Sequence, residues 1–204
     1  MRIISIHIGL KTGEKDFIFL RKAYELGFIP FYKRSFAKSP LDFAARTCLQ
    51  RVRQKETVKV KLEDVEGAWM FAHVNLDKIG VSVICDSEYP DPAAKKVIIG
   101  VIKSFTEKFT IGQILDQKVD TSMEFAELNK MIKLFQDPKE ADKLMKIEKE
   151  LDEIQVMLTK TLNDLLERGE KLDELAKTSE DISDTSYNFY KNAKKANSRC
   201  CSLY

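Results

Sequence analysis

The pattern of hydrophobic and polar positions changes near residue 137 of the 204-residue chain. Before that point, short segments either alternate between apolar and polar residues or repeat their apolar residues at helical spacing, as in a mixed α and β domain. After it, one helical repeat continues almost to the last residue. Asp137-Pro138, at the change, is a turn or helix-start signal. The pattern therefore predicts a folded domain followed by one long helix.

The first part contains strand-like segments that alternate or are rich in β-branched and aromatic residues. They cover residues 2–10, 16–20, 28–36, 56–63, 67–76 and 79–87. The third of these is weakened as a strand by Pro30. Helices are predicted over residues 39–54, 89–109 and 114–135, the first with Ser39 as N-cap and Pro40 at its first position. The order β-β-α-β-β-β-α-α, with about five strands, predicts an α+β domain of an antiparallel sheet and segregated helices.

The second part carries an apolar repeat that steps alternately by three and four residues and includes one arginine. The positions are Leu144, Ile147, Leu151, Ile154, Leu158, Thr161, Leu165, Arg168, Leu172, Leu175, Ser179, Ile182, Ser186, Phe189, Ala193 and Ala196. A strict 3.5-residue repeat of this length is typical of a supercoiled helix in a bundle. A straight helix would be about 80 Å long, so its partner helices must lie mostly outside this chain.

Arg168 occupies a position in this repeat where the pattern calls for an apolar residue, and two interpretations are open. Its long side chain can bend out of the seam into water. Alternatively, it is buried in the bundle, where a charge is tolerated only if acceptor oxygens surround it at the same level. In that case the arginine selects both the partner and the alignment of the helices. Gly169 follows directly, and a small residue there could make room for a broad guanidinium.

Charge and hydropathy limit the kinds of partner and the cellular location that we expect. Lysine and arginine total 34 and aspartate and glutamate 32, so the net charge is +2 and nothing favours nucleic acid as a partner. The longest apolar run near the middle of the chain, residues 97–102, is far shorter than the roughly 20 residues that a transmembrane helix needs. The first residues have the pattern of a strand and lack a cleavage site, so we expect a cytosolic protein.

The cysteines and histidines give no catalytic or metal-binding motif. No cysteine pair has C-x-x-C spacing, so we expect no metal site and no bound cofactor. Cys48 and Cys85 lie among apolar residues and are expected to be buried thiols. His7 and His73 fall in strand-like segments and are expected to be packed or edge residues. The common motifs of phosphate-binding, hydrolase and zinc enzymes are absent, so we expect no enzyme activity.

The last four residues have the layout of a prenylation signal, with Cys201 as the modified residue. Cys200 next to it is suited to reversible palmitoylation. Tyr204 departs from the usual last residues of the signal, which leaves farnesyl and geranylgeranyl both open. A frayed tail with two free thiols is the alternative. If both cysteines are modified, the covalent isoprenoid and palmitate serve as lipid anchors, because one lipid gives only marginal membrane binding and two give stable binding.

These features together resemble a known family, the longin-domain R-SNAREs, which are synaptobrevin-like proteins. The resemblance is closest to the prenylated and palmitoylated type that lacks a transmembrane helix. It is dense in residues 137–175, "DPKEADKLMKIEKELDEIQVMLTKTLNDLLERGEKLDEL", and in "FYKNAKKANSRCC". In the first part it is carried by "MRIISI", "FYKRSF", "CDSEYP" and "LFQDP".

The resemblance implies an architecture and a mechanism. Residues 1–137 would form a longin (profilin-like) domain with a five-stranded antiparallel sheet flanked by helices. Residues 138–198 would form the R-SNARE coiled-coil helix, and residues 199–204 a lipidated tail. The helix would join one helix each from three Q-SNAREs (Qa, Qb and Qc), with Arg168 as the ionic layer facing one glutamine from each. The protein would then act in docking and fusion of vesicles between ER, Golgi, endosomes and vacuole, as a cytoplasmic protein held peripherally on those membranes.

The resemblance also implies autoinhibition, in which the longin domain folds back over the SNARE motif. By its place in "LDFAARTC", Phe43 matches an aromatic position that the family uses in this closed state, although ordinary helix packing would equally explain it. Two alternatives to fusion remain at this point: a longin-domain protein with acyl-transfer activity, and a coiled-coil tether that does not fuse membranes.

Overall fold

The computed structural model describes residues 1–62, 67–140, 157–182 and 186, and it has a central sheet of six strands. The strands lie in the order β2-β1-β5-β4-β3-β6. Their bounds are Ile3–Lys11 (β1), Phe17–Tyr24 (β2), Thr57–Leu62 (β3), Ala68–Val74 (β4), Ile79–Asp86 (β5) and Met157–Thr161 (β6). The first five strands pair antiparallel, as predicted, whereas β6 pairs parallel with β3. The α+β class is confirmed, and the sixth strand corrects the predicted count.

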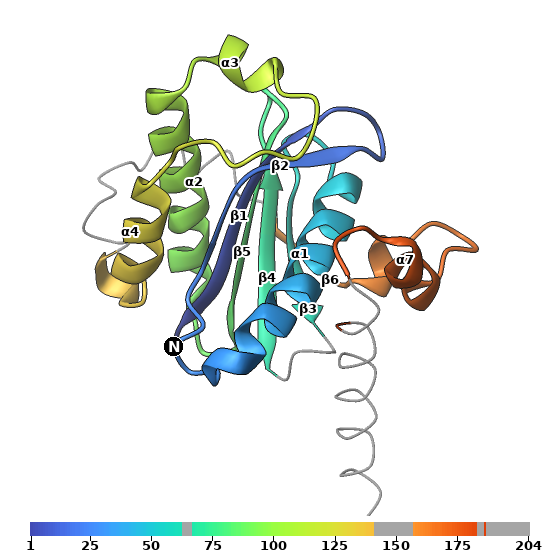
Figure 1. The fold of residues 1–204 in the computed structure, drawn as a ribbon, viewed down its shortest axis with the longest axis horizontal. Coiled ribbons are helices and arrows are strands. Elements are labelled where there is room, and N and C mark those ends of the chain that lie inside the picture. Colours follow the sequence, from blue (N-terminus) through green and yellow to red (C-terminus); the bar gives the residue numbers. More distant parts are fainter. Residues whose placement is uncertain (63–66, 141–156, 183–185, 187–204) are drawn as a thin grey trace, which may run out of the picture.

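Helices cover both faces of the sheet (Figure 1). Their bounds are Arg34–Arg51 (α1), Asp91–Lys108 (α2), Ile111–Leu115 (α3), Glu127–Leu134 (α4) and Leu172–Thr178 (α7), with 3-10 turns at Phe31–Lys33 (η1) and Asn163–Leu165 (η3). One buried cluster joins the sheet to α2 and α4, and a second joins its other face to α1 and α7. The second face is therefore the place where the carboxy-terminal part of the chain contacts the amino-terminal part.

Successive side chains of a strand point to opposite faces of the sheet, which explains why the core has two sides. In β1, Ile6 and Ile8 belong to the cluster under α2, whereas His7 between them faces α1. In β4, Phe71 belongs to the α2 side, and its neighbours Met70 and Ala72 belong to the α1 side. Both faces of the central strands are covered by helices, so the strands read as nearly continuous apolar runs.

The segment 28–36 is not a strand, which corrects one of the predicted elements. Pro30 precedes the turn η1, in which the Lys33 amide donates to the Pro30 carbonyl over 2.9 Å. The turn continues into α1, which begins at Arg34 and contains Pro40 within it rather than at its first position. Pro40 is the seventh residue of α1 and has no amide hydrogen, so the helix lacks the hydrogen bond that this position would otherwise donate to the Phe36 carbonyl.

The predicted helix over 114–135 is also corrected, because residues between α3 and α4 run along the sheet edge. The Thr121 amide donates to the Phe19 carbonyl over 2.9 Å, and the Met123 amide donates to the Leu20 carbonyl over 2.8 Å. Asp120 in turn accepts from the Phe19 amide over 2.9 Å. The segment satisfies and covers the outer edge of β2, which would otherwise expose unpaired backbone groups.

The thiols of Cys48 and Cys85 are buried, which confirms the prediction for both. Burial raises the pKa of each thiol above its ordinary value, because it disfavours the charged thiolate. Both side chains therefore serve as packing groups.

Candidate functional site

Residues 157–182, called here the docked segment, lie against the α1 face and the β3 edge of the amino-terminal domain (Figure 1). At its start, β6 extends the sheet by pairing residue for residue with β3, from Thr57 opposite Met157 to Lys61 opposite Thr161. After β6 the chain makes the turn η3 and then the short helix α7. Within the described residues, therefore, this part of the long repeat is not one continuous helix when the chain is alone.

Four apolar side chains anchor the docked segment. They are Leu162, Leu172, Ala176 and Ile182, all buried. They belong to the same cluster as Phe43 and Leu49 of α1 and Val58 and Val60 of β3. Burying one leucine side chain stabilises a contact by roughly 1.5–3 kcal/mol. These anchors therefore provide the main attraction between the docked segment and the domain.

The nine predicted bundle positions within the described residues differ in exposure. They are buried at Leu172, Ile182 and Ser186, half-buried at Thr161, Leu165, Leu175 and Ser179, and exposed at Leu158 and Arg168. The others lie outside the described residues: Leu144, Ile147, Leu151, Ile154, Phe189, Ala193 and Ala196, as do the predicted lipidation sites Cys200 and Cys201. Two anchors, Leu162 and Ala176, are not on the repeat and were missed by the sequence analysis.

Arg168 lies in a tight turn that separates η3 from α7. The Glu170 amide donates to the Glu167 carbonyl over 3.0 Å, and Gly169 between them has a φ of +99°. Glycine adopts this left-handed conformation readily, whereas other L-residues are strained in it. The Arg168 side chain is exposed at this turn.

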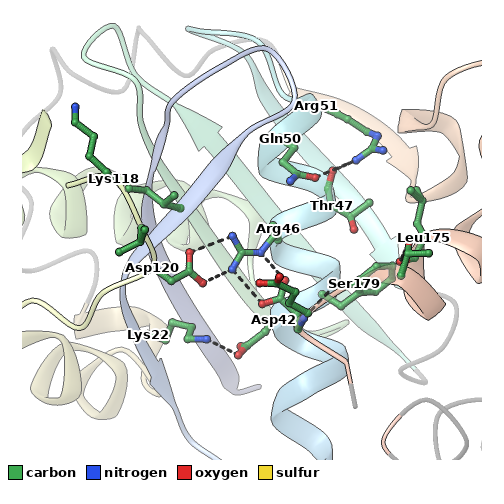
Figure 2. Close-up of a pocket in the computed structure, with 16 residues that line it drawn as sticks. Lys22, Asp42, Arg46, Thr47, Gln50, Arg51, Lys118, Asp120, Leu175 and Ser179 are labelled. Carbon is green, nitrogen blue, oxygen red and sulfur yellow. Dashed lines mark hydrogen bonds and ion pairs between the residues drawn. The ribbon is translucent and has the colours of Figure 1, made fainter. Parts of the chain in front are cut away.

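Arg46 of α1 connects three parts of the chain (Figure 2). Its guanidinium donates to Asp181 at the end of the docked segment over 3.1 Å and to Asp120 beside β2 over 3.2 Å. It also donates to the Phe17 carbonyl and lies 4.3 Å from the centre of the Phe19 ring. Burial alone would lower the pKa of Arg46, but the hydrogen bonds to Asp181 and Asp120 outweigh it and raise that pKa above its ordinary value. No sequence signal distinguished Arg46 from the other cations of α1.

Further ion pairs join the docked segment to the domain. Arg51 donates to Glu170 over 3.0 Å, and this pair is mostly buried. Lys160 in β6 lies 3.3 Å from Glu56, just before β3. These contacts fix the position of the docked segment, while the apolar anchors supply most of its attraction.

A cavity of about 830 Å³ separates α1 and β2 from the end of the docked segment (Figure 2). Phe43, Arg46 and Asp42 line it from α1, and Leu175 and Asp181 line it from the docked segment. The Phe43 side chain is only 4% exposed. The end of the docked segment thus sits over a partly open, mixed polar and apolar space and is not packed against the domain along its whole length.

A buried polar network lies under the same face. His7 bonds Ser82 through Nδ1 over 3.1 Å and Asp42 through Nε2 over 3.0 Å, while Asp42 also accepts from Lys22 and Tyr24. Ser82, His7 and Asp42 are thus hydrogen-bonded one after another, but Ser82 and His7 are fully buried, so no substrate can reach the Ser82 hydroxyl in this structure. His73 is buried as well and bonds the Thr57 hydroxyl over 2.8 Å. The histidines are packed, as predicted.

Stability is expected to fall between about pH 4 and pH 2 because of Asp42. Burial would raise the pKa of this carboxyl, but hydrogen bonds from His7, Lys22 and Tyr24 lower it from 3.8 to about 2. A carboxyl with a lowered folded pKa stabilises the protein above its unfolded pKa, and this contribution is lost as the pH falls through the folded pKa. The difference corresponds to about 2 kcal/mol.

Urea unfolding at several pH values tests this expectation with Asp42→Asn, which should show a flatter acid limb than the wild-type chain. Asp77→Asn removes an exposed carboxylate and is the control. Equal acid limbs for wild type and Asp42→Asn would rule out the assignment.

Among the residues that the structure describes, no helix is both long and apolar enough to cross a lipid bilayer.

Comparison with known proteins identifies the family. The family model described as Synaptobrevin matches residues 143–202. The chain is 33% identical over 199 residues to the Synaptobrevin homolog YKT6 of Yarrowia lipolytica, covering 97% of this chain and 98% of the relative. It is 34% identical over 189 residues to the VAMP-like protein YKT61 of Arabidopsis thaliana, covering 92% of each. It is 32% identical over 204 residues to the Synaptobrevin homolog YKT6 of Saccharomyces cerevisiae, covering 98% of each. The chain therefore belongs to the synaptobrevin family as a longin-domain R-SNARE of the YKT6 type, a partner of other SNARE helices in vesicle trafficking and membrane fusion.

Proposed function

We propose that residues 138–198 join three Q-SNARE helices in a four-helix bundle, and that the longin domain, residues 1–137, holds this motif closed until those partners arrive. One observation carries the proposal. Leu172 and Ile182 occupy seam positions of the repeat, yet both are buried against the α1 face. A side chain cannot be buried in the domain and in the bundle at once, so the two states exclude each other.

The closed state is held by contacts that end when the motif becomes helical. β6 pairs with β3 only while residues 157–161 are extended, and the turn at Gly169 interrupts any helix through that point. Phe43 belongs to the cluster that buries the docked segment and is the aromatic group we assign to holding it. Opening loses these contacts, and zippering then buries the full set of apolar layers, which drives assembly.

Arg168 is proposed as the ionic layer of the bundle. It is exposed in the closed chain, so its charge stays in water until partners assemble. A guanidinium buried in a bundle is strongly unfavourable unless acceptors surround it, and one glutamine oxygen from each of the Qa, Qb and Qc helices would supply them. The layer therefore acts as a check on partner and register.

The tail, residues 199–204, is proposed as the membrane anchor, with an isoprenoid on Cys201 and a reversible palmitate on Cys200. The C-a-a-X layout of the last four residues supports this assignment. Gain and loss of the palmitate would move the protein between cytoplasm and the Golgi, endosomal or vacuolar membranes. Mass spectrometry of the chain isolated from cells tests the isoprenoid.

Mixing the full chain with three Q-SNARE motifs should raise helicity above the sum of the separate components. β6, η3 and the turn at Gly169 would become helix, which circular dichroism detects. If no helicity is gained while a complex still forms, the proposed bundle is wrong.

Arg168→Leu is the matched variant for the ionic layer, because Arg168 is exposed in the closed chain and its replacement leaves the domain intact. The variant should still assemble, but with a wider set of helices. If the Arg168→Leu chain still assembled only with helices that carry glutamine at this layer, Arg168 would not select the partner or the register.

A further inference from the structure

The exposed aromatic side chains of the described part of the chain gather in one short segment. They are Phe28, Phe31, Tyr32 and Phe36, with exposed fractions of 49%, 80%, 60% and 36%. The other large aromatic residues in the described ranges are buried or half-buried. Single exposed apolar residues are ordinary, but a group of neighbouring aromatic residues indicates a surface that contacts something else.

The local fold holds these rings outward. The chain turns through η1 and enters α1, so Tyr32 and Phe36 are four residues apart in helical geometry and share one side. Phe31 and Tyr32 meet edge to face, with ring centres 5.7 Å apart. Ile29 packs partly against the core under α1, which fixes the base of the segment. The most exposed rings thus lie on an ordered turn.

Cations surround the rings. Arg2 lies 4.7 Å from the centre of the Phe28 ring, and Lys33 lies 5.8 Å from the centre of the Tyr32 ring. Lys38 is exposed in the next turns of α1. Residues 26–41 contain three cations and no aspartate or glutamate. The nearby Asp86 and Glu88 carry two negative charges, which are balanced by the amino-terminal ammonium group, 3.2 Å from each carboxylate, and by Arg2, 3.8 Å from Asp86. Lys33, Arg34 and Lys38 therefore supply the net positive charge of the patch.

We propose that this segment, residues 27–38, binds the surface of a membrane that contains anionic lipids, with Phe31 and Tyr32 entering the interfacial layer. Aromatic rings settle at the headgroup level of bilayers, and each nearby lysine or arginine adds attraction to anionic headgroups. The segment lies beside the amino terminus, at the end of the domain away from α3 (Figure 1). A flat bilayer can reach a projecting turn of this kind, whereas protein partners usually bury aromatic anchors in pockets. This contact requires neither the lipid tail nor the docked segment.

Vesicle co-sedimentation of the full chain, produced without isoprenoid or palmitate, tests the proposal. The probes are phosphatidylcholine vesicles with and without phosphatidylserine. Wild type should bind the anionic vesicles, and added salt should weaken binding. Phe31→Ser with Tyr32→Ser should lower binding at least about tenfold. Leu76→Ser removes another exposed apolar side chain, 61% exposed, and should bind like wild type.

Charge reversal at Lys33 and Lys38 is the second variant. It keeps the rings and should abolish the preference for phosphatidylserine. The proposal is overturned if wild type ignores the anionic vesicles, or if the Phe31 and Tyr32 substitutions leave binding unchanged. It is equally overturned if those substitutions abolish only self-association of the chain in the absence of vesicles, because the patch is then an interface between copies.

Discussion

Gly169→Ala is expected to open the closed chain and to accelerate its assembly with Q-SNARE helices. In the closed chain Gly169 has a φ of +99°, and an alanine there is strained by about 1 kcal/mol or more. No atom lies within 4 Å of the place where a Cβ would be added, so the effect is conformational and not steric. In a helix, alanine is about 1 kcal/mol more favourable than glycine. Both effects favour the bundle, and their sum of about 2 kcal/mol corresponds to roughly thirtyfold.

Hydrogen exchange of the β6 and α7 amides, together with the assembly rate, measures this shift. Gly67→Ala is the matched control, because Gly67 also has a positive φ, +69°, but lies in the connection before β4 and outside the docked segment. It should lower domain stability without accelerating assembly. Unchanged exchange and assembly rates in Gly169→Ala would mean that the turn does not limit opening.

Arg46→Gln is expected to release the end of the docked segment. The substitution removes the cation between Asp181 and Asp120 and leaves the Asp181 side chain, which is 8% exposed, without its charged partner. Breaking a buried pair costs several kcal/mol, and the partial exposure of Asp120 reduces this to about 2 kcal/mol here. Arg46 lies outside the bundle motif, so the assembled complex should be as stable as that of the wild type.

The assembly rate reports the release of the docked segment, and thermal unfolding of the free chain reports the loss of stability of the closed protein. Asp181→Asn removes the same contact from the other side, and the double variant should show strong coupling. Lys15→Gln is the control, because Lys15 pairs with Glu167 of the docked segment while both side chains are more than half exposed. It should change the rate by less than about threefold. An Arg46→Gln chain that assembled no faster than Lys15→Gln would show that Arg46 stabilises only the domain.

The first five strands could be predicted from the sequence because strand patterning is local, and the bundle repeat, which is also local, stays a prediction. Ile6, His7 and Ile8 alternate between the two faces of the sheet, and the repeat through Arg168 follows helical steps. The segment 116–126 could not be predicted, because its backbone bonds to β2, which is distant in the chain.

The closed state was harder to predict for a related reason. Residues 157–161 carry two positions of the helical repeat, Leu158 and Thr161, so nothing local indicates that they pair with β3. Leu162 and Ala176 lie off the repeat, and the partners of Arg46 are brought together only by the tertiary fold. The repeat that predicts the proposed bundle runs over many more residues than any local signal for the closed structure, so the sequence shows the bundle pattern more clearly.

The pairing of β6 with β3 has a consequence for the lifetime of the opened protein. When β6 leaves, β3 becomes an outer strand with unpaired backbone groups, and such strands invite pairing between molecules. β3 is only six residues long, and it carries the exposed side chain of Lys61, whereas the ammonium group of Lys59 pairs with Asp91 over 2.7 Å. A short outer strand with a charged lysine disfavours pairing with the strand of another copy. The opened molecule is thereby protected from aggregation and can remain monomeric while it searches for its partners.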